Sequence, residues 1–267
     1  MNEKNTTFGF LDQYVLVVGG FRGMGLELAR LLLDDGANIA IIGRDSERGE
    51  KAKQVLSHPE MDPRRLKIIQ ADLSREELLQ GAQAEVEQWC SGKLHHLAVF
   101  LGSGKTPPGH DFPLEHWRTV FEVNLFAPIG VVQSFVPMML HGKGNPSVVL
   151  TGAIAGIERV QAPMTYSIAK TALVAYSNHL AESLVDKGIR VLTISPGNVF
   201  YKGGRWEEIM KDQPTEVAKL LEEKVGMKRL GTAEELAWVY LSNMSPKNSF
   251  TTGQNIVCDG LQTNRIF

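Results

Sequence analysis

Residues 14–25 read Tyr-Val-Leu-Val-Val-Gly-Gly-Phe-Arg-Gly-Met-Gly, an apolar run that leads directly into a glycine-rich turn. The run predicts a buried strand over 14–18, and the apolar residues at 26–33 predict a helix. Glycines in such a turn let backbone N–H groups approach a pyrophosphate, whose negative charge the helix N-terminus attracts. An ordinary tight turn is the alternative. The candidate dinucleotide-binding residues are Gly19, Phe21, Arg22, Gly23, Met24 and Gly25.

Short β-rich runs and longer helical patterns alternate along most of the chain. This alternation predicts βαβ units, whose right-handed crossovers place the strands in one parallel sheet with helices on both faces. Most of the runs are apolar on both sides, as burial under two helix layers requires. The expected fold class is therefore α/β, with a doubly wound parallel sheet. The predicted strands are 14–18, 38–42, 66–70, 95–101, 147–151, 189–195 and 254–257.

The segment 199–229 interrupts this rhythm. It contains Lys-Gly-Gly-Arg at 202–205 and then a charged helical stretch, before a helical pattern resumes over 232–243. We interpret the segment as a substrate-loop region that lies over the active site. No repeat, low-complexity stretch or flexible linker divides the sequence, so we expect a single domain over residues 1–267.

The composition excludes several classes of protein. With 43% hydrophobic and 22% charged residues among 267, the chain is neither disordered nor fibrous. Its 28 basic and 30 acidic residues give a net charge of −2 without a basic block, so we expect no nucleic acid and no membrane as partner. The most apolar stretch, 125–140, contains Gln133, Ser134 and two prolines, and falls short of the ~18 apolar residues of a spanning helix. A small-molecule substrate is the expected ligand.

Two further features favour a cytoplasmic location. Residues 1–10 carry no apolar stretch of signal-peptide length, so we expect no targeting segment. The two cysteines, Cys90 and Cys258, form no CxxC pair, and the adjacent His95 and His96 point to opposite faces of a predicted strand. We therefore expect neither a disulfide framework nor a metal site.

The second predicted strand ends in Ile-Ile-Gly-Arg at 41–44. Dinucleotide sites usually carry an acidic residue there, which binds the ribose 2′-hydroxyl and would repel a 2′-phosphate. Arg44 offers a guanidinium instead, and Arg22 in the glycine-rich turn offers a second. Charge-assisted hydrogen bonds from both would hold a 2′-phosphate, so we expect NADP(H) rather than NAD(H). The alternative is that both arginines are solvated surface charges.

Tyr166 and Lys170 lie in a helical pattern over 163–187. Their separation by four residues places both side chains on one helix face. A neighbouring ammonium favours phenolate over phenol, so Lys170 would lower the pKa of Tyr166 and make it a general acid or base near neutral pH. A solvated helix face is the alternative interpretation of the pair.

Six features follow one another along the chain: the glycine-rich turn, Arg44, Asp72-Leu73, Asn124, the Tyr166/Lys170 pair and Ser195-Pro196-Gly197. In this order they resemble the short-chain dehydrogenase/reductase family, and the resemblance covers nearly the whole chain. It implies a Rossmann fold. It also implies that Tyr166 exchanges a proton with the substrate oxygen, that Lys170 binds the nicotinamide ribose, and that Asn124 supports a water relay. The resemblance further implies cofactor contacts at Asp72, Leu73, Gly102, Pro196, Gly197 and Val199, and adds Arg-Leu-Gly-Thr at 229–232 as a C-terminal signature.

The sequence departs from the family at one catalytic position. The family has a serine thirteen positions before the tyrosine, which polarises the substrate carbonyl, and here that position is Ala153. The loss of one donor to a developing oxyanion commonly costs on the order of 100-fold in rate. Thr151 would stand in if it faces the same side, or it merely ends the strand. In the loop 102–110, Lys105 would suit an anionic substrate, or the loop is simply solvated.

The leading hypothesis is an NADP(H)-dependent oxidoreductase that transfers hydride between nicotinamide and a carbonyl or alcohol, with reduction by NADPH as the favoured direction. Two alternatives remain. The missing serine would suit a cofactor-binding regulatory protein without hydride chemistry, or a cofactor-assisted epimerase or dehydratase. The family resemblance also implies a homotetramer or homodimer packed through the helices around Asn124 and Tyr166.

Overall fold

The computed structural model describes residues 8–140 and 144–264; most of the stretch 1–10, in which we expected no targeting segment, lies outside these residues. Within them, seven strands form one parallel sheet in the order β3-β2-β1-β4-β5-β6-β9. The strand order runs outward from β1 in one direction and from β4 in the other, so the α/β, doubly wound fold is confirmed. The strands are β1 (Tyr14–Val18), β2 (Asn38–Gly43), β3 (Leu66–Gln70), β4 (His96–Val99), β5 (Ser147–Thr151), β6 (Arg190–Pro196) and β9 (Asn255–Cys258).

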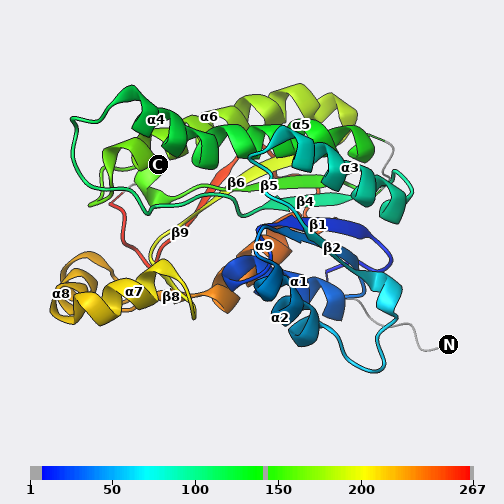
Figure 1. The fold of residues 1–267 in the computed structure, drawn as a ribbon, viewed down its shortest axis with the longest axis horizontal. Helices are drawn as coiled ribbons and strands as arrows, with labels where there is room; N and C mark the ends of the chain where they lie inside the picture. Colours follow the sequence, from blue (N-terminus) through cyan, green and yellow to red (C-terminus); the bar gives the residue numbers. More distant parts are fainter. Residues whose placement is uncertain (1–7, 141–143, 265–267) are drawn as a thin grey trace.

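Helices cover both faces of the sheet (Figure 1). Leu28 and Leu241 are buried in the core beneath one helix layer. Phe135 and Leu173 are buried beneath the other. Because both faces are covered, the strands are apolar on both sides, as the sequence predicted. One layer contains α1 (Gly23–Asp34), α2 (Ser46–Leu56) and α9 (Ala233–Met244), and the other contains α3 (Glu76–Cys90), α4 (Leu114–Phe121), α5 (Ala127–Met139) and α6 (Met164–Leu184).

The predicted strand 95–101 differs most from the observed element. β4 spans only His96–Val99, after which the chain leaves the sheet in an irregular segment. The apolar pattern continues past the strand because Phe100 and Leu101 still pack against the core. Gly102 follows with φ +145°, a conformation that L side chains rarely adopt. The other predicted strands agree with the observed ones to within one residue at each end.

A long helical segment runs over Leu114–Met139 and joins α4 to α5 through a π-helical turn, η2 (Glu122–Phe126). Its length and composition alone would let it cross a membrane, whereas the sequence analysis excluded a span because of its polar and proline residues. Half of its most apolar 18-residue stretch is buried inside the protein. Core helices of globular proteins pass the same test, so this helix is weak evidence for a membrane span.

The segment 199–229 forms a small unit beside the carboxyl ends of the strands (Figure 1). Its charged stretch folds as two helices rather than one, and a short parallel strand pair joins its two ends. Thr232 then begins α9 with a capping box, in which its side chain and that of Glu235 bond each other's backbone N–H groups. The elements are β7 (Val199–Phe200), α7 (Arg205–Asp212), α8 (Pro214–Lys224) and β8 (Gly231–Thr232), and the short helices elsewhere are η1 (Pro63–Arg65), η3 (Ile154–Gly156) and η4 (Val185–Lys187).

Arg190, at the start of β6, ties the sheet to the end of α9. Its guanidinium donates to the carbonyl oxygens of Asn243, Met244, Ser245 and Thr251 at 3.0–3.2 Å, and the residue is 5% exposed. Carbonyls at a helix C-terminus have no partners within the helix. The arginine therefore satisfies groups that burial would otherwise leave unpaired.

We predict that Arg190→Met lowers the free energy of unfolding by about 2–4 kcal/mol, because several buried carbonyls lose their donor. Urea denaturation followed by circular dichroism measures the change. Arg118→Met is the matched control, since Arg118 is 72% exposed and its one ion pair among the described residues is with the exposed Glu115, and it should change stability by less than about 0.5 kcal/mol. Equal effects of the two substitutions would contradict this role of Arg190.

Candidate active site

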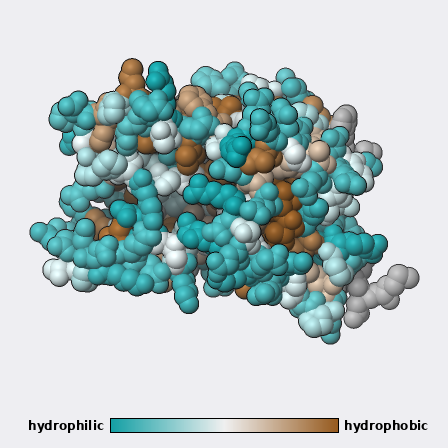
Figure 2. Space-filling model, viewed as in Figure 1, coloured by the Kyte–Doolittle hydropathy of each residue, from teal (hydrophilic) through white to brown (hydrophobic). Residues whose placement is uncertain are grey.

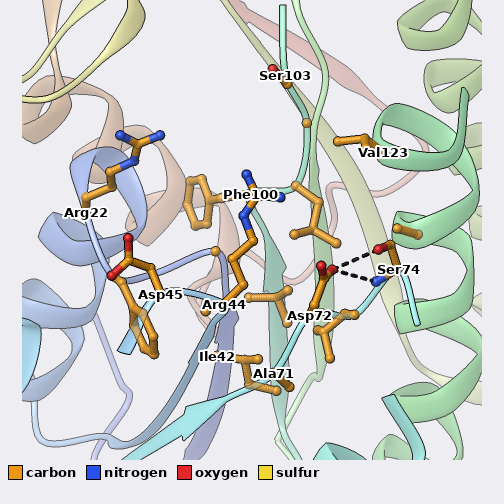
Figure 3. Close-up of a pocket in the computed structure, with 18 of the residues that line it drawn as sticks. Arg22, Ile42, Arg44, Asp45, Ala71, Asp72, Ser74, Phe100, Ser103 and Val123 are labelled. Carbon is orange, nitrogen blue, oxygen red and sulfur yellow. Dashed lines mark hydrogen bonds between the residues drawn. The ribbon is translucent and has the colours of Figure 1, made fainter. Parts of the chain in front are cut away.

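A pocket of about 210 Å³ lies at the carboxyl ends of β1 to β4 (Figure 3). This is the crevice that opens where the strand order reverses, and ligands of doubly wound sheets bind there. The wall opposite the glycine-rich turn comes from the segment after β4 and from Val123 on η2. Of the predicted cofactor-binding residues, the pocket is lined by Gly19, Phe21, Arg22, Arg44, Asp72, Leu73 and Gly102.

The glycine-rich turn has the geometry that a pyrophosphate site requires. Gly19 has φ +80°, and a Cβ there would lie 2.8 Å from the carbonyl oxygen of Phe100. A Cβ on Gly25 would lie 2.8 Å from the Cα of Gly20, so only glycine lets α1 pack this close to the turn. Helix α1 has no acidic residue in its first turn and no side-chain cap, which leaves its N–H groups available to an anion.

Three arginines line the pocket at the ends of β1 and β2. Arg44 extends into its middle, between Asp45 and Asp72 (Figure 3). Arg22 donates from Nη1 to the carbonyl oxygen of Gly203 at 2.6 Å. Arg48, on α2, lies 3.4 Å from the Asp45 carboxylate through Nε. Among the described residues, the Arg44 guanidinium makes no hydrogen bond or ion pair, so it is the arginine best placed to receive a phosphate.

Sequence reasoning missed Arg48. The signal was available, because Arg48 follows Arg44 by four residues at the start of a helical pattern. At the other side of the pocket, Asp72 accepts hydrogen bonds from the backbone and hydroxyl of Ser74 at 3.2 and 2.8 Å, which fixes the turn after β3 (Figure 3).

Lys170, Asn124 and Tyr166 converge on the backbone that follows β4. Lys170 is 2% exposed, and its Nζ donates to the carbonyl oxygens of Leu101 at 3.2 Å and Thr151 at 2.8 Å. A Cβ on Gly102 would lie 2.8 Å from that Nζ and 2.9 Å from Oδ1 of Asn124. Two residues later, a Cβ on Gly104 would lie 3.9 Å from the Tyr166 ring. The structure therefore brings the three predicted catalytic residues together.

Asn124 lies in the π-helical turn between α4 and α5. Its amide donates to the carbonyl oxygen of Val120 at 2.9 Å and to that of Ser103 at 3.2 Å, while its Oδ1 accepts from the Ser103 N–H at 2.9 Å. Single π-turns within helices occur often at functional sites. This one bonds Asn124 to the segment after β4, and periodicity in the sequence gave no sign of it.

The pKa values of Tyr166 and Lys170 differ from those that their spacing in the sequence predicted. Burial raises the pKa of Tyr166 to about 12 and lowers the pKa of Lys170 to about 7. The sequence analysis expected the Lys170 ammonium to lower the tyrosine pKa. In the structure Lys170 bonds two carbonyl oxygens, and desolvation disfavours the charged form of each side chain. Tyr166 is consequently protonated at neutral pH.

Thr151 does not replace the missing serine. Its hydroxyl lies 2.7 Å from the hydroxyl of Tyr240 on α9, which covers the sheet face opposite α6. Ala153 begins η3 and is 8% exposed. The next elements do follow the family pattern, because a Cβ on Gly156 would lie 2.8 Å from the backbone of Lys170, so this turn and α6 pack closely. The side chain at position 153 thus lacks a hydroxyl where the resemblance expects one.

The remaining predicted cofactor residues of the glycine-rich turn and of the segment after β6 do not line this pocket. Gly23, Met24 and Gly25 form the first turn of α1, behind the glycine-rich turn. Pro196 ends β6, where a Cβ on Gly197 would lie 2.8 Å from the Cα of Asp259. Val199 is buried in β7. These residues lie beyond the part of the crevice that the described pocket covers.

Polar contacts on both sides connect the unit 199–229 to the crevice. Lys105 Nζ pairs with Oε1 of Glu208 on α7 at 2.7 Å, and Arg22 bonds Gly203 from the glycine-rich turn. The Lys105 charge is therefore compensated within the protein, which removes the reason to expect an anionic substrate from this residue. A hollow lies between this unit and the helices on the other side of the sheet (Figure 2).

Among residues 8–140 and 144–264, no group of three or more His, Cys, Asp and Glu side chains could hold a metal ion. His96 is fully buried and its ring nitrogens bond Ser147 at 2.8 Å and Gln13 at 2.5 Å. It fills a structural position at the end of the sheet opposite the pocket.

We predict that Gly102→Ala weakens NADPH binding by at least about tenfold, because the new methyl group would collide with Lys170 Nζ and Asn124 Oδ1 at a strained φ. Fluorescence titration of the cofactor measures the affinity. Gly81→Ala on α3 is the control, since nothing lies within 4 Å of its Cβ, and it should leave affinity unchanged and stabilise the helix slightly. Wild-type affinity in Gly102→Ala would show that this crowding is irrelevant to the site.

Comparison with known proteins agrees with this geometry. A family model described as Enoyl-(Acyl carrier protein) reductase matches residues 19–260. Isoepoxydon dehydrogenase patN of Penicillium expansum is 29% identical over 95% of this chain and 96% of its own. The structure of Pseudomonas aeruginosa RhlG with NADP is similar with a TM-score of 0.85 and 27% identity, covering 95% of this chain and 97% of that one. An NADPH-bound short chain oxidoreductase of P. aeruginosa PAO1 is described as containing an atypical catalytic center. Its structure is similar with a TM-score of 0.86 and 25% identity, and the match covers 96% of this chain and 99% of that one. The chain belongs to the short-chain dehydrogenase/reductase family.

Proposed function

We propose that this protein is an NADP(H)-dependent oxidoreductase that transfers hydride between the nicotinamide and a carbonyl or alcohol carbon of a small-molecule substrate. The observation that carries the proposal is the convergence of Tyr166, Lys170 and Asn124 on the backbone around Gly102, next to a pocket lined by the glycine-rich turn. Tyr166 is the acid, Lys170 the buried amine and Asn124 the amide of this site. Together they would transfer protons next to a cofactor that transfers hydride.

The residues of the pocket fit a phosphorylated dinucleotide. The N–H groups at the start of α1 suit the pyrophosphate, and Arg44 with Arg22 and Arg48 suits a 2′-phosphate. Arg44 would bind this phosphate directly, whereas Arg22 would first exchange its bond to Gly203. The NADP and NADPH bound to the two similar P. aeruginosa structures support the same cofactor here.

The proposed chemistry divides between cofactor and protein. Reduced nicotinamide supplies the hydride for the carbonyl carbon. Tyr166 donates its phenolic proton to the carbonyl oxygen as negative charge develops there, and its raised pKa keeps that proton in place at neutral pH. Lys170 and Asn124, beside Gly102, would hold the nicotinamide ribose and the water relay that returns a proton to Tyr166. The products are the alcohol and the oxidised cofactor.

Reduction by NADPH is the direction that this proposal favours, with Tyr166 as the proton donor. Alcohol oxidation would need the same residue to accept a proton. The two alternatives remain distinguishable from this proposal. A regulatory protein would bind the cofactor and consume none, and a cofactor-assisted epimerase or dehydratase would transform substrate without net consumption.

Further parts of the proposal concern the surroundings of the site. The unit 199–229 would cover the substrate, since its contacts through Glu208 and Gly203 reach both sides of the crevice. Exposed apolar side chains at Leu114, Phe126 and Ile168, on the helices around Asn124 and Tyr166, support a homodimer or homotetramer. A cytoplasmic location and the absence of nucleic-acid and membrane partners stay predictions from composition.

We predict that Arg44→Asp raises the Kd for NADPH by at least about tenfold and leaves the Kd for NADH unchanged or lower, because a carboxylate repels the 2′-phosphate and accepts from a 2′-hydroxyl. Parallel fluorescence titrations with both cofactors measure this. Arg64→Asp makes the same change of net charge at an exposed residue before β3, away from the pocket, and should leave both affinities near wild type. An Arg44→Asp protein that still prefers NADPH would rule out this phosphate contact.

Replacing Tyr166 tests the chemistry itself. Tyr166→Phe should lower turnover by roughly 10²- to 10⁴-fold, as the loss of a general acid does, while the affinity for NADPH stays near wild type. The assay follows NADPH absorbance across a panel of ketones and aldehydes, with Ala153→Ser included because it restores a donor to the carbonyl. Full turnover by Tyr166→Phe on a substrate of the wild-type protein would refute the proposed role.

A further inference from the structure

A buried pair of hydroxyl groups lies on the side of β5 opposite α6. The Thr151 hydroxyl and the Tyr240 hydroxyl are 2.7 Å apart, and Tyr240 is 0% exposed. Buried hydroxyls need a hydrogen-bond partner, and these two satisfy each other across the contact between β5 and α9. The pair therefore fixes the end of β5 relative to α9.

The same two residues contact the groups that hold Lys170. The backbone carbonyl of Thr151 accepts from Lys170 Nζ at 2.8 Å. The second acceptor of Lys170 is the carbonyl of Leu101, and the preceding residue, Phe100, packs its ring against Tyr240 with centroids 4.5 Å apart. Tyr240 thus touches both chain segments, after β4 and at the end of β5, whose carbonyls bind the Lys170 ammonium.

We propose that Tyr240 and Thr151 are positioning residues for Lys170: their hydroxyl pair holds the Thr151 carbonyl in place, so that this carbonyl stays an acceptor for the protonated Lys170 amine and keeps the amine beside Gly102 and Asn124. A buried ammonium stays charged only where fixed acceptors replace its water. The consequence of this arrangement for catalysis rests on the proposed function, whereas the arrangement itself is testable without turnover.

The titration of Lys170 is a direct readout of this positioning. Burial lowers the pKa of Lys170 to about 7, which places it in a range where the folded protein can be studied. Burial raises the pKa of Tyr240; the hydrogen bond to Thr151 offsets part of this rise, and Cys258 on β9 and Tyr166 on α6 add to it. Burial also raises the pKa of Tyr166, to about 12, and the pKa of the Cys258 thiol. None of these three groups therefore ionises in the pH range of the Lys170 titration.

The experiment follows the Nζ and Cε resonances of Lys170 by NMR in protein labelled at lysine, with Lys170→Arg to assign them, as pH varies without cofactor. Thr151→Val and Tyr240→Phe each remove one hydroxyl. We expect each to shift the titration midpoint downward by about 0.5–1 pH unit, which is a three- to tenfold loss in the protonation constant. The double variant should shift it no further than either single variant, because one interaction is lost in all three.

Two control variants separate positioning from a general loss of structure. Thr151→Ser keeps a hydroxyl on β5, and Ser242→Ala removes an exposed hydroxyl from α9 that bonds only its own helix. Both should keep the wild-type midpoint. The dispersion of the same spectra reports whether each variant is folded.

An unchanged midpoint in folded Tyr240→Phe or Thr151→Val would overturn the proposal, as would additive shifts in the double variant. Because the readout needs neither NADPH nor a substrate, such a failure is distinct from failure of the proposed oxidoreductase activity. Conversely, a shifted midpoint in a protein that reduces no carbonyl would support the positioning role and count only against the activity.

Discussion

The parallel sheet imposes the constraint on which the other features depend: the carboxyl ends of all its strands meet at one edge. Where the strand order reverses, between β1 and β4, the chain departs to opposite faces of the sheet and a crevice opens. The glycine-rich turn, Arg44 and Asp72 follow β1, β2 and β3, and Gly102 follows β4. Residues distant in sequence thereby line one pocket, and each is placed by the end of a strand rather than by a loop of its own.

The buried amino group of Lys170 determines how the backbone around Gly102 packs. Among residues 8–140 and 144–264 no carboxylate pairs with it; carbonyl oxygens of Leu101, just after β4, and of Thr151, at the end of β5, take the place of water. The backbone at Gly102 passes so close that only glycine fits, and Asn124 is bonded to the same segment from a π-turn. The result is a compact polar centre beside the pocket. Tyr166 keeps its proton at neutral pH, whereas the pKa of Lys170 is lowered to about 7.

Much of the fold followed from sequence because burial on both faces leaves continuous apolar runs. Strands such as β1 and β5 were predicted to the residue, and residues of the glycine-rich turn line the pocket. Other features had no local signal. The π-turn at Asn124 interrupts a helix without glycine or proline at that point, the partner of Thr151 lies 89 residues away, and the pKa of Tyr166 follows from burial rather than from its spacing to Lys170. Tertiary contacts decide these properties, so periodicity and residue type could not supply them.

The central claim is that this site moves hydride between a nicotinamide and a carbonyl carbon. The most direct measurement is isotopic: the protein is incubated with NADPH deuterated at both C4 positions of the nicotinamide and with the panel of carbonyl compounds, and the alcohols are analysed by mass spectrometry. The account predicts one deuterium on the carbinol carbon of the product, with equimolar oxidation of the cofactor. Tight binding of NADPH with no deuterium in any product and no oxidation of the cofactor would contradict it and favour the cofactor-binding protein without hydride chemistry.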